Sequence, residues 1–284
     1  MAKSTREIQR RIKGVGNTRQ ITRAMELVSS AKMRKARIRL EESRPYYQTV
    51  LNSISSILNN AKVNHPMLQP REVKKSLYIV ITSDRGLAGG YNSNINRLVD
   101  NKFKNNKEDI SLITVGLKGR DFFKKRGYDV IDEFIGISED PEFSHAKEIG
   151  KLATDLFLKG EIDEINLVYT EFISTISYNP MIRKILPVED ISQDDDGPIE
   201  IIEFEPSAQE ALDFLIPKYM EAIIFGALIE SSSSEQGARR TAMQAATENA
   251  DEMIEELNMI YNRARQTAIT MELSEIVAGA DALE

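Results

Sequence analysis

The chain has 284 residues, enough for two structural units, and its 41% hydrophobic and 29% charged residues are typical of a soluble globular protein. It contains no cysteine, which excludes disulfides, thiolate metal sites and a cysteine nucleophile. No run of about 18 apolar residues occurs, and the first residues lack the apolar segment of a secretory signal. We therefore expect neither secretion nor direct membrane insertion.

The net charge of −7 is unevenly distributed along the chain. Residues 1–44 carry 13 Lys and Arg against 4 Asp and Glu, so the rest of the chain holds 24 basic and 40 acidic residues. A basic first segment on an acidic protein suggests a polyanion, such as nucleic acid, or an acidic protein partner. The alternative is that these charges form an ordinary solvated helix face.

The first 60 residues predict one long helix with a narrow apolar stripe. No proline occurs from Ser4 to Ser43, Pro45 allows a kink, and the helix is expected to end near Asn59–Asn60. Apolar residues recur at spacings of three and four, which is typical of a seam between helices. These residues are Ile8, Ile12, Val15, Ile21, Met25, Val28, Val50, Ile54 and Ile57.

The last part of the chain predicts a second long helix. From Lys218 to Glu284 there is no proline, and a helix of about 65 residues would be roughly 100 Å long. The run Ser231–Ser234 is its weak point, because serine side chains compete for backbone hydrogen bonds. Its predicted seam is Ala250, Met253, Leu257, Ile260 and Ala264. Residues 1–60 and 207–284 are therefore expected to form an antiparallel coiled coil, since each narrow stripe needs a partner.

Between the two helices the pattern changes to strands that alternate with short helices. This alternation predicts a doubly wound, Rossmann-like α/β domain over residues 72–206, so the expected fold class is α/β with a long coiled coil. The expected strands are 76–82, 110–116, 128–135 and 164–172, with a weaker pair at 178–186 and 199–205, and the expected helices are 92–104, 118–126 and 142–159.

A glycine-rich stretch follows the first strand, at the place where doubly wound domains bind ligands. It comprises Asp84, Arg85, Gly86, Gly89 and Gly90. No Lys-Ser/Thr pair follows the glycines, and their spacing differs from a dinucleotide fingerprint. We interpret the stretch as a tight surface turn that aims Asp84 and Arg85 at another surface, and we expect no bound cofactor.

The sequence shows no catalytic constellation. His65 and His145 are isolated and are expected to be surface histidines, and no pair of histidines is spaced to hold a metal on one helix face. Two alternatives remain open: a coiled-coil protein that binds nucleic acid through the basic N-terminal helix, and a nucleotide-binding enzyme of the doubly wound class. Against the first, the basic segment has no aromatic residue before Tyr46 and no reader motif.

Three separated motifs resemble the gamma subunit of the F-type ATP synthase in its bacterial form. They are NTRQITRAMELVSSAKMRKA (Asn17–Ala36), SDRGLAGGYN (Ser83–Asn92) and ITMELSEIVAGA (Ile269–Ala280), with SEQGARRTAMQAATENA (Ser234–Ala250) and YNRARQ (Tyr261–Gln266) as further matches. The resemblance covers essentially the whole chain. Independently of the resemblance, the apolar C-terminal tip in the last motif predicts that a partner protein surrounds this end of the helix.

The resemblance implies a noncatalytic rotor shaft. The coiled coil would insert into a ring of three alpha and three beta subunits, and the central domain would lie against the epsilon subunit and the membrane c-ring. Proton flow would turn the c-ring and this subunit on the cytoplasmic face of the bacterial plasma membrane, driving ATP synthesis. Residues that would contact the beta subunits are Met25, Arg34, Lys35, Arg239, Gln266, Thr270 and Glu272.

Overall fold

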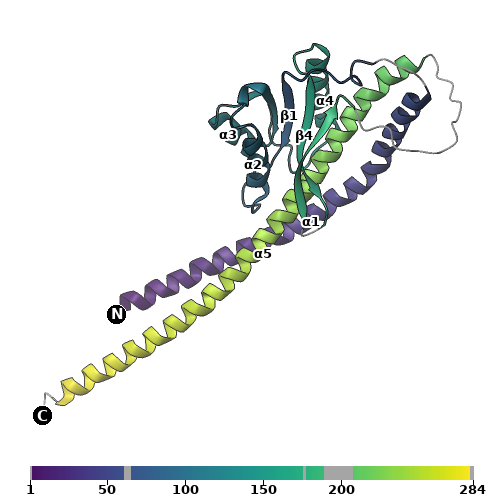
Figure 1. Cartoon of the computed structure of the whole chain (residues 1–284). Helices are drawn as coiled ribbons and strands as arrows, with labels where there is room; N and C mark the ends of the chain where they lie inside the picture. Colours follow the sequence, from purple (N-terminus) through teal and green to yellow (C-terminus); the bar gives the residue numbers. More distant parts are fainter. Residues whose placement is uncertain (1, 61–64, 175–176, 189–206, 282–284) are drawn as a thin grey trace. The chain divides into compact units, whose positions relative to one another are not determined.

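The computed structural model describes residues 2–60, 65–174, 177–188 and 207–281 (Figure 1). Two long helices lie at the two ends of the chain: α1 (Ala2–Asn60) and α5 (Ala208–Asp281). The end of α1 is confirmed, Pro45 lies inside α1, and α5 continues through Ser231–Ser234 without a break. The strand expected at 199–205 lies outside the described residues.

The chain divides into two compact units. Met1–Ser29 with Arg239–Glu284 form the first, here called the helical unit, and Ser30–Ala238 form the second, here called the sheet unit. The partition expected from the sequence, with boundaries at 60, 72 and 207, stays a prediction. Each long helix contributes residues to both units, and each unit is described separately below.

The sheet unit contains a five-stranded sheet in the order β3-β2-β1-β4-β5. The first four strands are parallel, and β5 pairs with β4 in the antiparallel direction. Both β1 and β2 are buried along their whole length, as continuous apolar runs predict. The strands are β1 (Ser76–Ile81), β2 (Ile110–Val115), β3 (Asp129–Phe134), β4 (Glu164–Phe172) and β5 (Tyr178–Leu186).

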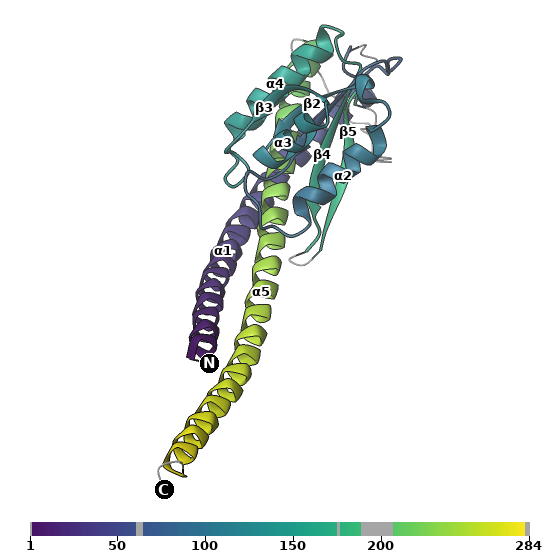
Figure 2. The ribbon, with the colours of Figure 1, turned by 90° about the vertical axis from the view of Figure 1, so that its left-hand side faces the viewer.

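Helices cover both faces of this sheet, which confirms the doubly wound fold (Figure 2). The helices α2 (Tyr91–Phe103) and α3 (Leu117–Lys125) pack on one face, where Phe123 is fully buried. On the other face α4 (Phe143–Leu158) packs with α5 and the last turns of α1. A short 3-10 helix, η1 (Lys107–Asp109), precedes β2. Side chains alternate between the two faces along β1, as the strand period requires.

In the helical unit α1 and α5 run antiparallel. The side chain of Gln9 donates to the Tyr261 hydroxyl at 3.0 Å, and Arg19 pairs with Asp251 at 2.9 Å. The hydroxyls of Thr22 and Thr247 hydrogen-bond at 2.7 Å in the interior. As the residue number rises on α1 it falls on α5, so the antiparallel coiled coil is confirmed.

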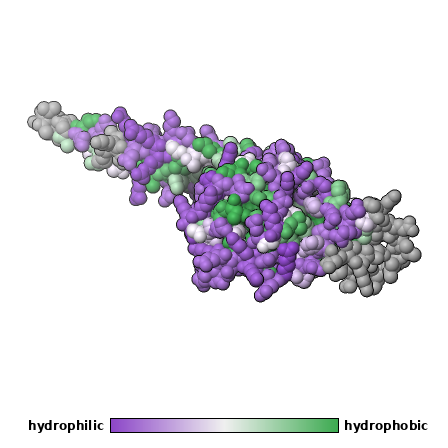
Figure 3. Space-filling view, turned by 90° about the horizontal axis from the view of Figure 1, so that it is seen from above, coloured by the Kyte–Doolittle hydropathy of each residue, from purple (hydrophilic) through white to green (hydrophobic). Residues whose placement is uncertain are grey.

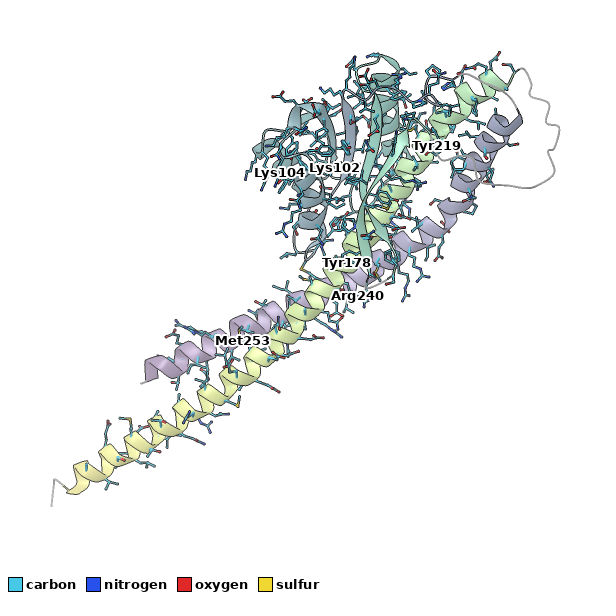
Figure 4. The ribbon with its side chains drawn as sticks, in the orientation of Figure 1. Lys102, Lys104, Tyr178, Tyr219, Arg240 and Met253 are labelled. Carbon is cyan, nitrogen blue, oxygen red and sulfur yellow. The ribbon has the colours of Figure 1, made fainter. Side chains whose placement is uncertain are left out.

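The register of the α5 seam differs from the predicted one. Ala250, Leu257 and Ala264 face inward as predicted, whereas Met253 and Ile260 are 50% and 47% exposed (Figure 4 shows Met253). Their inner places are taken by Ile254 and Tyr261. On α1 the same shift exposes Ile21 and Val28 and buries Thr22 and Ser29. Spacings of three and four suited either register, and the buried Thr22–Thr247 pair fits only the observed one.

Candidate functional site

The glycine-rich turn after β1 is tied into the sheet unit. The Asp84 carboxylate accepts from the backbone N–H of Leu117 at 3.1 Å and of Ser138 at 3.2 Å, and the Asp84 N–H donates to the Ser138 hydroxyl. Asp84 therefore points inward and holds two neighbouring loops, so the expectation that it aims outward is wrong. Arg85 does point outward, with its side chain 75% exposed. Of the three glycines, only Gly89 has a positive φ, at 54°.

The chain's own helix lies across the carboxyl edge of the sheet. The Ser231 hydroxyl accepts from the Thr170 N–H at the end of β4, and the Ser234 hydroxyl donates to the Thr170 carbonyl. Ala238 packs against Ala88 and Tyr91, which follow β1. In doubly wound domains ligands bind at this edge, where the strand order reverses between β1 and β4. Here α5 occupies that place, which argues against the nucleotide-binding enzyme.

The serine run is a feature that sequence reasoning misjudged. The side chains of Ser231–Ser234 are 0–2% exposed, and Glu235 is 0% exposed. All eight residues from Ser231 to Ala238 are buried, which means that protein surrounds this part of the helix on all sides. Since serine hydroxyls can bond to the strand backbone, the run that weakens an isolated helix here fixes α5 to the sheet.

Within the sheet unit, the β3–α4 loop, residues 135–142, connects the basic part of α1 to the sheet. Lys32 Nζ lies 2.6 Å from the Glu139 carboxylate, and Lys35 and Arg39 both pair with Asp140. On the other side of the loop, Ser232 of α5 donates to the Glu139 carbonyl at 3.3 Å. The basic cluster is thus partly neutralised within the chain, which leaves less charge for a polyanion than the sequence suggested.

The pKa of Asp140, in this loop, is set by burial and by the neighbouring positive charges. Partial burial alone would raise the pKa of Asp140, but the positive charges of Lys35 and Arg39 outweigh it and lower that pKa below its ordinary value. Asp140 therefore stays ionised at neutral pH. Its side chain is 64% exposed, so salt screens these pairs and each one is weak.

The helical unit exposes apolar side chains on both helices. Gln9 lies opposite Tyr261, so an antiparallel register places Ala2 opposite Ala268. Beyond that point α5 continues alone to Asp281, and all its side chains from Ile269 to Ala278 are exposed. Exposed apolar residues there are Ile269, Met271, Leu273, Ile276 and Val277, and those on α1 are Ile21, Leu27 and Val28. Such a surface is typical of a protein-binding site.

The residues that the resemblance assigns to beta-subunit contact occupy different environments. Exposed on α5 are Gln266, Thr270 and Glu272, and exposed on α1 is Arg34. Lys35 is also exposed but pairs with Asp140 at 3.4 Å. Met25 is half-buried, and Arg239 is only 5% exposed. Contact with a beta subunit stays a prediction for all seven.

The two histidines have structural roles. His65 is 5% exposed, and its Nε2 lies 2.9 Å from Asp213, while its Nδ1 accepts from the Met67 N–H. The expectation of a surface histidine is therefore wrong for His65. His145 caps the start of α4 by accepting from the Glu142 N–H. Within the described residues no three His, Asp or Glu side chains cluster as a metal site, and no described helix is apolar enough along its length to cross a membrane.

A family model described as ATP synthase matches residues 4–283. The chain is also 51% identical to the ATP synthase gamma chain of Alkaliphilus metalliredigens, over the whole length of both. The chain belongs to the ATP synthase gamma chain family. Another family member, from Brevibacillus brevis, is 48% identical over 99% of each chain. A third, from Acetobacterium woodii, is 45% identical over the whole of both chains and is named sodium ion specific.

Solved structures of ATP synthases agree with this family assignment. A chain from the central stalk and c-ring structure of the Tetrahymena thermophila mitochondrial ATP synthase is 27% identical, with a TM-score of 0.62 over 80% of this chain and 99% of that one. A chain of the Euglena gracilis mitochondrial ATP synthase has a TM-score of 0.74 over 100% of this chain and 95% of that one, at 19% identity, which shows the shared fold. None of these relatives or structures supports the nucleic-acid alternative.

Proposed function

We propose that this gamma chain is the central rotor shaft of an F-type ATP synthase. The observation that carries the proposal is the exposed apolar end of α5 beyond the start of α1. A helix that exposes Ile269, Leu273 and Ile276 in water needs a surrounding protein surface. A ring of three alpha and three beta subunits would supply that surface.

The shaft performs no chemistry in this proposal. Rotation presents different faces of α1 and α5 to each beta subunit in turn, and ligand affinities change because the contact free energy differs between faces. Exposed Gln266, Thr270 and Glu272 on α5 and Arg34 on α1 are the proposed contacts. Arg239 is nearly buried, so we assign it to holding the shaft rather than to a first contact with a partner.

The sheet unit is the part that receives torque from the membrane sector. It would lie against the epsilon subunit and the c-ring, on the cytoplasmic face of the bacterial plasma membrane as a peripheral component. The buried Ser231–Ser234 run and the β3–α4 loop support this role, because they fix both α1 and α5 to the sheet.

The test is purification of the tagged chain from its native membrane in a mild detergent. The rotor proposal expects alpha and beta subunits in a three-to-one ratio to this chain, together with ATPase activity. Recovery of the chain alone, or with nucleic acid, would contradict it. In the latter case the affinity for nucleic acid would fall steeply as salt rises.

A further inference from the structure

The sheet unit contains a cavity of about 520 Å³ between α1, α5 and the strands β4 and β5. Its walls are mostly apolar and include Leu40, Tyr46, Leu167, Ile223 and Phe225. Cavities of about 300–1,000 Å³ with such walls and a few polar groups are the usual form of small-molecule sites. The proposed rotor function makes no use of this cavity.

A glycine forms part of the wall that α5 contributes. Gly226 lies inside the long helix, where glycine is less favourable than alanine. A Cβ added at Gly226 would meet nothing within 4 Å, so the packing of this chain gives no reason for a glycine there. The missing side chain leaves bare helix backbone facing the cavity, which lets a bound molecule approach closely.

The polar end of the cavity carries balanced charge. Tyr169 from β4, Arg183 from β5 and Glu230 from α5 line it together. Burial, with the nearby Glu230 charge, raises the pKa of Tyr169 to about 12, so its hydroxyl stays protonated at neutral pH while it interacts with Arg183. One positive and one negative side chain offset each other, which favours an uncharged polar group over an ion.

We propose that this cavity binds a small uncharged amphiphile. An aromatic or alicyclic body would lie between Leu40, Leu167 and Ile223, over Gly226, and one hydroxyl or carbonyl oxygen would hydrogen-bond at Tyr169. Because the walls come from α1, α5 and the sheet, an occupant would stabilise the attachment of α1 in this unit through linkage. The inference is independent of the rotor function.

The experiment is a fluorescence titration of the full chain with 1-naphthol. The chain has no tryptophan, so naphthol emission can be excited and read without interference from an indole. We expect one saturable site with a Kd of about 10–100 µM, which lies within the limit on affinity per non-hydrogen atom for a small ligand. Naphthalene-1-sulfonate, which has the same ring and a negative charge, should bind at least about tenfold more weakly because its charge must be desolvated.

Matched variants locate the site. Gly226→Leu should remove the saturable naphthol binding by filling the cavity, whereas Gly16→Leu, at another helix glycine with nothing within 4 Å, should leave it unchanged. If Gly226→Leu fails to fold by circular dichroism, Tyr169→Phe replaces it and should weaken 1-naphthol about fivefold while leaving naphthalene unaffected. Absence of saturable binding, equal affinity for the sulfonate, or unchanged affinity in a folded Gly226→Leu or Tyr169→Phe variant would overturn the proposal.

Discussion

Removal of the charge on the β3–α4 loop should loosen the attachment of α1 within the sheet unit. The double variant Glu139→Gln, Asp140→Asn keeps the size of both side chains and removes both carboxylates. Lys32 lies 2.6 Å from Glu139 and Lys35 lies 3.4 Å from Asp140, with Arg39 also on Asp140 and Arg85 near Glu139. The least exposed carboxylate, that of Glu139, is 24% exposed and should contribute most.

The magnitude follows from the exposure of these pairs. Exposed ion pairs contribute about 0.2–1 kcal/mol each, so the four together should contribute about 1–2 kcal/mol to the free energy of unfolding. For a unit of this size that corresponds to a fall in Tm of about 2–8 °C. The fall should shrink markedly between 50 mM and 500 mM salt, because partly exposed charges are screened.

Tyrosine fluorescence during heating is the assay. Of the nine tyrosines only Tyr261 lies outside Ser30–Ala238, and tryptophan is absent, so the signal follows the sheet unit. The matched control is Glu7→Gln with Glu41→Gln, which removes two carboxylates from pairs within one helix. A fall in Tm equal to that of the control, or one that high salt leaves unchanged, would refute the reasoning.

The same loop gives a pH dependence with a definite sign. The pKa of Asp140 is lowered in the folded chain, so its contribution to stability is present above the unfolded pKa and is lost as pH falls through the folded pKa. The fall in Tm caused by Asp140→Asn should therefore be full at pH 7, shrink as the pH drops below the ordinary aspartate pKa, and vanish in acid below the lowered pKa of the folded chain. A fall in Tm that stays constant from pH 7 to that acid range would contradict this assignment.

Three further predictions concern other parts of the chain. Thr22→Val and Thr247→Val should each lower the unfolding free energy by about 1 kcal/mol, because the hydroxyl that remains loses its side-chain partner and keeps only a backbone carbonyl. The double variant should cost less than the sum of the two, and additive costs in a denaturant series would contradict this. Gly116→Ala should lower the free energy of unfolding by about 3 kcal/mol, because Gly116 has φ +90° and an added Cβ would lie 2.4 Å from the Thr82 carbonyl oxygen. An unchanged melting curve would exclude this close contact. Gln266→Ala should lower the ATPase turnover of the assembled complex without preventing assembly, and wild-type turnover would remove it from the proposed contacts.

The sequence predicted the elements of the sheet unit closely because its signals are local. Continuous apolar runs predicted β1 and β2 within one residue, and β4 and β5 fall where expected. The register of the coiled coil was not predictable in the same way. Met253 and Ile254 are adjacent and both apolar, so the choice between them depends on partners on α1 that only the fold brings close.

The polar contacts within the sheet unit were missed for a related reason. Ser231–Ser234 looks like a helix weakness until β4 supplies Thr170 as a hydrogen-bond partner. Asp84 looks like a surface charge until the loops containing Leu117 and Ser138 surround it. These partners are 33 to 64 residues away in sequence, and no local pattern encodes them.

On the face drawn in Figure 3, by contrast, hydrophilic side chains predominate and apolar ones gather in a patch, as composition alone leads one to expect.

The rotation of the sheet unit in the assembled complex tests the central claim most directly. The chain has no cysteine, so Lys104→Cys, an exposed position at the end of α2 (Figure 4), gives a unique attachment point for a bead. With the alpha and beta subunits fixed to a surface and ATP added, the bead should turn in one direction, with three pauses per turn. A complex that hydrolyses ATP steadily while the bead stays still would contradict the account.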